Sequence, residues 1–170
     1  MCIRDRSKST PAVLNYAALK NELLANNINT EPSNDDENIA LAKTISNTVI
    51  VVRQSKLPDP NVIGNAGSFF KNPVVNAEHA QSLKARYPKL VSYEQPNSQV
   101  KLAAGWIIDS LGYKGYRAGA VGVHTDQALD LVHEGGGTGA ELMAVAHEII
   151  EKVDESFGVR LEIEPVIVKN

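Results

Sequence analysis

The sequence has 170 residues and a single cysteine, Cys2, so an internal disulfide and a metal site built from several cysteines are excluded. So little cysteine suits a reducing compartment, and we expect a cytoplasmic protein. Charge of one sign is not in excess either, because the net charge is -3 and the lysines and arginines are spread along the chain. Nucleic acid is therefore not an expected partner.

Long hydrophobic runs are also missing. No apolar stretch approaches the roughly 20 residues that a membrane-spanning helix needs, and the opening letters MCIRDR lack the apolar core of a signal peptide. We therefore expect neither a membrane protein nor an export substrate. Residues 1–6 share no periodicity with the rest of the chain and are interpreted as a non-native scar, outside the fold.

Three common chemical signatures are absent. The residues around Ser68 do not form the G-x-S-x-G elbow of a hydrolase. The glycine-rich EGGGTG at 134–139 lacks the lysine of a phosphate-binding loop, so a flexible surface turn is favoured over the site of a nucleotide hydrolase. The histidines are too widely spaced for a local metal signature, and no metal site is expected; they are His79, His124, His133 and His147.

The composition is that of a soluble globular protein, with 43% hydrophobic and 22% charged residues. Three- and four-residue apolar spacing, together with proline and glycine stops, predicts helices at about 17–24, 37–55, 77–87, 100–111 and 140–157, with Asp35 and Asp36 as caps of the second. Short strands are expected at 11–16, after the bend at Gly64 and Gly67, over 115–124 and over 159–168. A loop carrying Tyr93 is expected between two of the helices. These elements predict an α+β fold.

The segment GNAGSFFKNP, residues 64–73, concentrates what a binding loop needs. Gly64 and Gly67 allow unusual backbone angles, Ser68 is a small donor, and Lys71 and Asn72 suit anions or amides. A structural turn with exposed polar residues explains the same pattern. The residues alone leave both interpretations open.

Two further positions also have two interpretations. Lys56 ends a helix and is either a solvated cation beside the helix C-terminus or a ligand for phosphate. Glu162 and Glu164 alternate along the last predicted strand and point to one face, while Leu161 and Ile163 point to the other. That face is either a solvated edge or a source of carboxylates for a cleft.

Four blocks in this order and spacing resemble the C-terminal half of the UDP-N-acetylenolpyruvoylglucosamine reductase family. They are RxxKLPDP at 53–60, GNAGSFFKNP at 64–73, KLAAGWIID at 101–109 and LExE at 161–164. The resemblance extends over nearly everything from about Pro11 onward. It implies a reductase of peptidoglycan precursor synthesis, and with it roles in cell-wall biogenesis, cell shape and cell division.

The resemblance implies a two-step reduction. NADPH reduces FAD, the flavin passes a hydride to the vinyl carbon of UDP-N-acetylglucosamine enolpyruvate, and the resulting enolate is protonated to give UDP-N-acetylmuramate. Ser68 matches the family's serine proton donor, and Glu164 matches its active-site glutamate. A serine hydroxyl is a weak acid, so groups that stabilise charge must assist it. The residues that match substrate contacts are Lys56, Asn72, Tyr93 and Gln127.

The resemblance also sets limits on this chain. Arg53 matches a position near the flavin or the substrate edge, but the glycine-rich flavin-binding segment and the family's enolate-stabilising arginine have no counterpart here. We expect residues 7–57 to be the end of an FAD-binding domain, with exposed apolar surface on residues 11–52, and residues 58–170 to be the substrate-binding domain. The chain is then a fragment that does not reduce the substrate alone. The alternative is a stand-alone UDP-sugar-binding or scaffold module.

Overall fold

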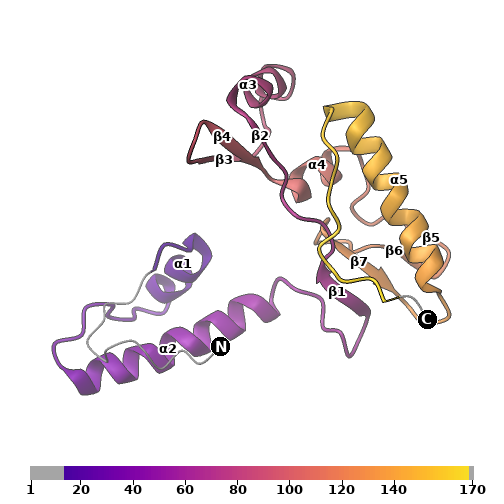
Figure 1. Cartoon of the computed structure of the whole chain (residues 1–170). Coiled ribbons are helices and arrows are strands. Elements are labelled where there is room, and N and C mark those ends of the chain that lie inside the picture. The colour runs from indigo at the N-terminus through magenta and orange to yellow at the C-terminus, as the bar shows by residue number, and fades with distance from the viewer. Residues whose placement is uncertain (1–13, 169–170) are drawn as a thin grey trace. The chain divides into compact units, whose positions relative to one another are not determined.

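The computed structural model describes residues 14–168, which form two compact units that divide between Leu57 and Pro58 (Figure 1). The scar interpretation of residues 1–6 lies outside the described residues, as does most of the short strand expected at 11–16; its last residues, 14–16, are not in a strand. Over residues 14–168, no helix combines the length and the apolarity needed to cross a membrane.

The first unit contains two helices, α1 (Ala17–Ala25) and α2 (Asp35–Gln54), and both were predicted from the apolar spacing. The cap of α2 is one residue earlier than expected. Asn34, not an aspartate, accepts the Glu37 N–H at 2.9 Å, while the Glu37 carboxylate accepts the Ser33 N–H at 2.8 Å. The backbone bond from Ser33 is the main reason that the pKa of Glu37 is lowered. The two bonds together satisfy amide groups at the start of the helix that have no partner within it.

Many apolar side chains of this unit remain exposed. Leu19 and Leu23 of α1 and Leu41 and Val52 of α2 are buried. The exposed apolar side chains are Tyr16, Leu24, Ile39, Ile50, Val51 and Leu57. The expectation of exposed apolar surface before residue 52 is therefore confirmed for the described part of that range.

The second unit combines helices with two antiparallel sheets, ordered β1-β7-β6-β5 and β2-β4-β3. The strands are β1 (Gly64–Ser68), β2 (Val74–Asn76), β3 (Ser92–Gln95), β4 (Gln99–Leu102), β5 (Arg117–Ala118), β6 (Val121–Val123) and β7 (Asp130–His133). The helices are α3 (Ala77–Arg86), α4 (Ala104–Ser110) and α5 (Gly139–Phe157). The predicted α+β fold is confirmed.

The main core lies between α5 and the four-stranded sheet (Figure 1). The inward face of α5 is wholly apolar, as its periodicity predicted; its buried residues are Val145, Ala146, Ile149, Ile150, Val153 and Phe157. Thr138 and Glu141 form a capping box at its start, and Gly158 ends it with φ +62°. Because both ends of α5 are satisfied locally, the helix can bury this face along its length against the sheet.

Four sequence predictions in this unit were wrong in part. The helix expected from about residue 100 begins only at Ala104, because β4 precedes it and pairs with both β2 and β3. Tyr93 lies in β3, opposite Lys101, and not in a loop. The strand expected over 115–124 is a hairpin of β5 and β6, and the strand expected at the C-terminus is reduced to one bridge between Phe70 and Ile163.

A carboxylate of α5 joins two tyrosines near the start of β5. The Tyr113 hydroxyl donates to Glu148 Oε1 at 2.9 Å, and the Tyr116 hydroxyl donates to Oε2 at 3.3 Å. The two rings meet edge to face, with centroids 5.3 Å apart. Burial, followed by the bond to Glu148, raises the pKa of Tyr113, whereas the charge of Glu148 is the main reason that the pKa of Tyr116 is raised. Both phenols therefore stay protonated donors at neutral pH.

We expect Tyr113→Phe to lower the free energy of unfolding by about 1–2 kcal/mol, because a buried hydrogen bond to a charged acceptor is lost while the ring is kept. Urea unfolding at pH 7 measures the change. Tyr93→Phe is the matched control, since that ring is exposed, and it should change the free energy by less than about 0.5 kcal/mol. Equal effects of the two substitutions would show that the contact to Glu148 does not stabilise the fold.

Candidate functional site

Ser68 lies at the end of β1, directly after a bulge. In the ladder with β7, Asn65 pairs with Val132 and Ser68 pairs with Asp130, so two residues of β1 face one residue of β7. One of the two, Gly67, has φ +70°, a conformation that favours glycine. Ser68 itself is exposed. A bulge bends the strand and changes the direction of the side chains beyond it. The direction of the Ser68 side chain therefore depends on this bulge.

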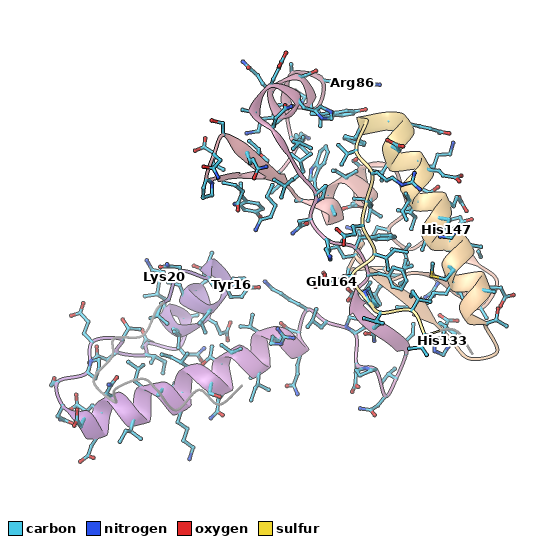
Figure 2. The ribbon with its side chains drawn as sticks, in the orientation of Figure 1. Tyr16, Lys20, Arg86, His133, His147 and Glu164 are labelled. Atoms are coloured by element: carbon cyan, nitrogen blue, oxygen red, sulfur yellow. The ribbon has the colours of Figure 1, made fainter. Side chains whose placement is uncertain are left out.

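The segment after Ser68 is held on both sides. On one side the Phe69 N–H donates to the Leu129 carbonyl at 2.8 Å. On the other, the Glu164 N–H donates to the Phe69 carbonyl at 3.0 Å, and the Lys71 N–H donates to the Glu162 carbonyl at 2.9 Å. These bonds bring the backbone of Glu164 next to the residue that follows Ser68, so the two residues predicted to be catalytic lie at one place. Figure 2 shows Glu164 where the C-terminal segment passes β1.

The polar side chains of this segment divide between paired and free groups. Lys71 forms an ion pair with Glu162, so its charge is already balanced within the site. Glu162 and Glu164 are exposed while Leu161 is buried and Ile163 is half-buried, as the alternation predicted. Among residues 14–168, no side chain hydrogen-bonds to the Ser68 hydroxyl, so no base is in place to activate it. The hydroxyl is therefore open to a ligand and is not set up as a nucleophile.

Asn72 connects the loop to α4. Its Oδ1 accepts the Ala104 N–H at 2.9 Å, so the side chain satisfies an amide at the first turn of that helix. Gln127 lies half-buried in the connection between β6 and β7, where its carbonyl accepts the Asp130 N–H at 3.0 Å. Asp130 thus contacts Gln127 through its backbone and pairs with Ser68 across the ladder. The side chain of Asn72 is thereby held by α4, and the backbone of Gln127 is held by the residue that pairs with Ser68.

Tyr93 is set apart from these residues because it lies on β3 of the other sheet. Its side chain is 52% exposed and faces Lys101 across the ladder. No contact within the described residues links it to Ser68. Its role as a substrate contact stays a prediction.

Lys56 and Arg53 belong to the first unit. The Lys56 ammonium donates to the Tyr16 hydroxyl at 3.4 Å and lies 5.4 Å from the centre of that ring. Arg53 lines a cavity of about 180 Å³ together with Tyr16, Leu19 and apolar residues of α2. Ligand pockets usually measure about 300–1,000 Å³. The cavity at Arg53 is therefore smaller than a usual ligand pocket, and the role of Arg53 near the flavin stays a prediction.

Sequence reasoning missed one residue of this region, Asp130. It is 2% exposed, and among the described residues nothing donates a hydrogen bond to its Oδ2. Burial raises the pKa of Asp130, and the nearby His124 opposes this shift. The signal available in the sequence is a lone carboxylate between Leu129 and Leu131, inside an otherwise apolar run. Ionisation of this buried carboxyl, which has no hydrogen-bond donor for Oδ2 among the described residues, would destabilise the end of the sheet where Ser68 lies.

Residues 14–168 contain no cluster of three or more histidine, cysteine, aspartate or glutamate side chains that could hold a metal ion. Near Ser68 the described residues offer its hydroxyl, the carboxyl group of Glu164 and the amides of Asn72 and Gln127. This set can bind a polar ligand and can donate a proton to it.

Comparison with known proteins gives consistent results. The family model described as "UDP-N-acetylenolpyruvoylglucosamine reductase, C-terminal domain" matches residues 58–168. A UDP-N-acetylenolpyruvoylglucosamine reductase of Ralstonia nicotianae is 50% identical over 153 residues, which is 90% of this chain and 42% of that protein. The reductase of Cupriavidus pinatubonensis is 58% identical over 127 residues, or 75% of this chain and 38% of that protein. The chain spans about two fifths of the length of these curated relatives.

Proposed function

Because the chain belongs to the family of UDP-N-acetylenolpyruvoylglucosamine reductase C-terminal domains, we propose that it supplies the substrate site and the proton donor for reduction of UDP-N-acetylglucosamine enolpyruvate to UDP-N-acetylmuramate. The observation that carries this proposal is the open hydroxyl of Ser68, which follows a bulge, with Glu164 held one residue away across a backbone hydrogen bond. The proposal places the chain in peptidoglycan precursor synthesis in the cytoplasm, and so in cell-wall biogenesis, cell shape and cell division.

In the proposed reaction the enolpyruvyl double bond takes up a hydride and a proton. The hydride comes from FAD that NADPH has reduced, and Arg53 is the residue of this chain that we propose lies near that group. This chain's own part is the proton. The Ser68 hydroxyl delivers it to the carbon of the enolate, and the serine oxygen is then reprotonated from water. Glu164 is the second residue that we propose takes part in catalysis.

The substrate contacts follow from the chemistry of the UDP-sugar. The Lys56 ammonium suits a pyrophosphate oxygen, and it is exposed and contacts the Tyr16 hydroxyl. Asn72 and Gln127 present amides for the sugar and the nucleotide, and Tyr93 presents an exposed ring and hydroxyl. A pyrophosphate brings negative charge to a chain with a net charge of -3. Local cations such as Lys56 therefore matter more than the overall field.

We expect calorimetry to detect binding of UDP-N-acetylglucosamine enolpyruvate to the chain, and Lys56→Ala to weaken it about 10-fold or more, because a hydrogen bond between charged groups is lost. Lys43→Ala is the control, since Lys43 is an exposed lysine of α2 with no part in the proposed site, and it should leave the affinity unchanged. No binding by the wild-type chain would contradict the proposal that this chain forms the substrate site. An equal loss of affinity in both variants would show that Lys56 acts only through general electrostatic attraction and does not contact the substrate.

A further inference from the structure

The bend before Ser68 depends on one side chain, that of Asn65. Its Oδ1 accepts the Gly67 N–H at 3.0 Å, while its Nδ2 donates to the Ile63 carbonyl at 3.0 Å and to the Pro58 carbonyl at 3.3 Å. Both ends of the amide are therefore used to hold the backbone on the two sides of Asn65. The side chain is part-buried, so water replaces these bonds poorly if they are lost.

Gly67 supplies the backbone conformation that the bulge needs. Its φ is +70°, and a Cβ added there would meet nothing within 4 Å. The position is therefore restricted by its dihedral angle and not by space. A residue with a Cβ is disfavoured in this region of backbone conformation, and asparagine is among the non-glycine residues that tolerate it best.

The bulge decides to which face of the sheet Ser68 belongs. Continuing the regular ladder from the pair of Asn65 and Val132 would place Gly67 opposite Asp130 and Ser68 opposite Leu129. Side chains at 129 and 131 share a face, and Leu131 is part of the core. A shift of one residue moves a side chain to the other face. The extra residue therefore moves Ser68 from the face of Leu129 and Leu131 to the face of Asp130.

We propose that Asn65 and Gly67 are positioning residues that hold this bulge and so aim the Ser68 hydroxyl at the reacting carbon of the substrate; the inference rests on the proposed function of Ser68. Neither residue needs to touch the substrate. Asn65 acts by bonding the backbone before and after itself, and Gly67 acts by adopting the left-handed conformation. A misplacement of about 1 Å at a proton donor lowers the rate by up to about 100-fold.

The first arm of the test needs no catalysis and uses the chain itself. NMR spectroscopy compares wild type, Asn65→Ala, Gly67→Ala and Gly67→Asn through the cross-strand nuclear Overhauser effect between Ser68 and Asp130. We expect Asn65→Ala and Gly67→Ala to weaken or lose it and Gly67→Asn to retain it. Gly112→Ala is the matched control, because Gly112 also has positive φ and open space around it but follows the end of α4. It should lose similar stability and leave the signal intact.

The second arm measures turnover in the complete reductase that contains this chain. We expect Gly67→Ala to lower kcat about 10- to 100-fold with a change in KM of less than about 3-fold. Gly67→Asn should restore most of kcat, and Gly112→Ala should change neither constant. The inference is overturned if Gly67→Ala keeps both the Ser68 signal and kcat, or if Gly112→Ala matches its losses. Failure of the proposed function is distinct, since the wild type would then not turn over while the NMR arm still decides the role of the bulge.

Discussion

Gly122→Ala is expected to lower the free energy of unfolding by about 2–4 kcal/mol. A Cβ at this position would lie 2.2 Å from the Tyr116 carbonyl oxygen and 2.8 Å from the Arg117 Cδ, with the Arg117 Cα at 3.1 Å. The closest atom belongs to the backbone, so it cannot move aside as a flexible side chain can. The same carbonyl accepts the Val123 N–H at 2.9 Å. Relief of the clash therefore breaks a bond of the hairpin that contains β6.

Thermal or urea unfolding measures this effect, and Gly139→Ala is the matched control. Gly139 is the first residue of α5, has no positive φ, and an added Cβ would meet nothing within 4 Å. Alanine there should be neutral or stabilise by up to about 1 kcal/mol, because it removes freedom from the unfolded chain. If both alanines had the same effect, the close approach at Gly122 would be irrelevant to stability.

Asp130→Val is expected to raise the free energy of unfolding at pH 8 by about 1–3 kcal/mol, since a buried carboxyl without a donor for Oδ2 is replaced by an apolar side chain suited to a strand. Burial raises the pKa of Asp130 above its unfolded value, so between the two pKa values the folded state binds more protons than the unfolded state. Stability from this group is therefore present at low pH and is lost as pH rises through that window.

The groups that act on this carboxyl are few. β1 and β6 contribute no titratable side chain of their own, and the side chains that α5 buries are all apolar. His124 lies just beyond β6, and its positive charge lowers the pKa of Asp130. This narrows the pH range between the pKa of Asp130 in the unfolded state and its pKa in the folded state. At a pH below the pKa of Asp130 in both states, the gain in free energy of unfolding from Asp130→Val should be smaller.

Unfolding curves from pH 3 to 8 test this, with Asp126→Asn as control. Asp126 is an exposed carboxylate in the connection between β6 and β7, and its loss should shift the curve by less than about 0.5 kcal/mol. A wild-type curve that is parallel to that of Asp130→Val over the whole range would contradict the assignment of a raised pKa to this buried carboxyl.

Helices with repeating apolar faces were predictable because burial of one face is a property of the segment itself. α2, α3 and α5 begin and end close to their expected limits for that reason. β4 was not predictable from the sequence, because this strand of four residues leads directly into α4. Val100 and Leu102 fit the spacing of a strand and that of a helix equally well. Its identity is decided by pairing with β2 and β3, which is a property of distant segments.

The candidate site shows the same division. The composition of GNAGSFFKNP drew attention to Ser68, and the alternation of Glu162 and Glu164 was interpreted correctly, because both are local signals. The one-residue shift that changes the face of Ser68 could not be predicted from the sequence of β1 alone, because it is defined by the pairing of β1 with β7. The burial of Asp130 was missed for the same reason. Chain connectivity alone does not tell which neighbours close over a side chain.

The bond between Asn72 and α4 has a consequence for the chemistry of any ligand that reaches it. Because the Ala104 N–H is a donor, the oxygen of the amide must face it, and the orientation of the amide is fixed. The group turned outward is then the NH₂, which only donates. A phosphate or carbonyl oxygen satisfies it, whereas a hydroxyl can bind there only as an acceptor. The hydrogen bond to the first residue of α4 therefore restricts the outward group of Asn72 to ligand atoms that accept a hydrogen bond.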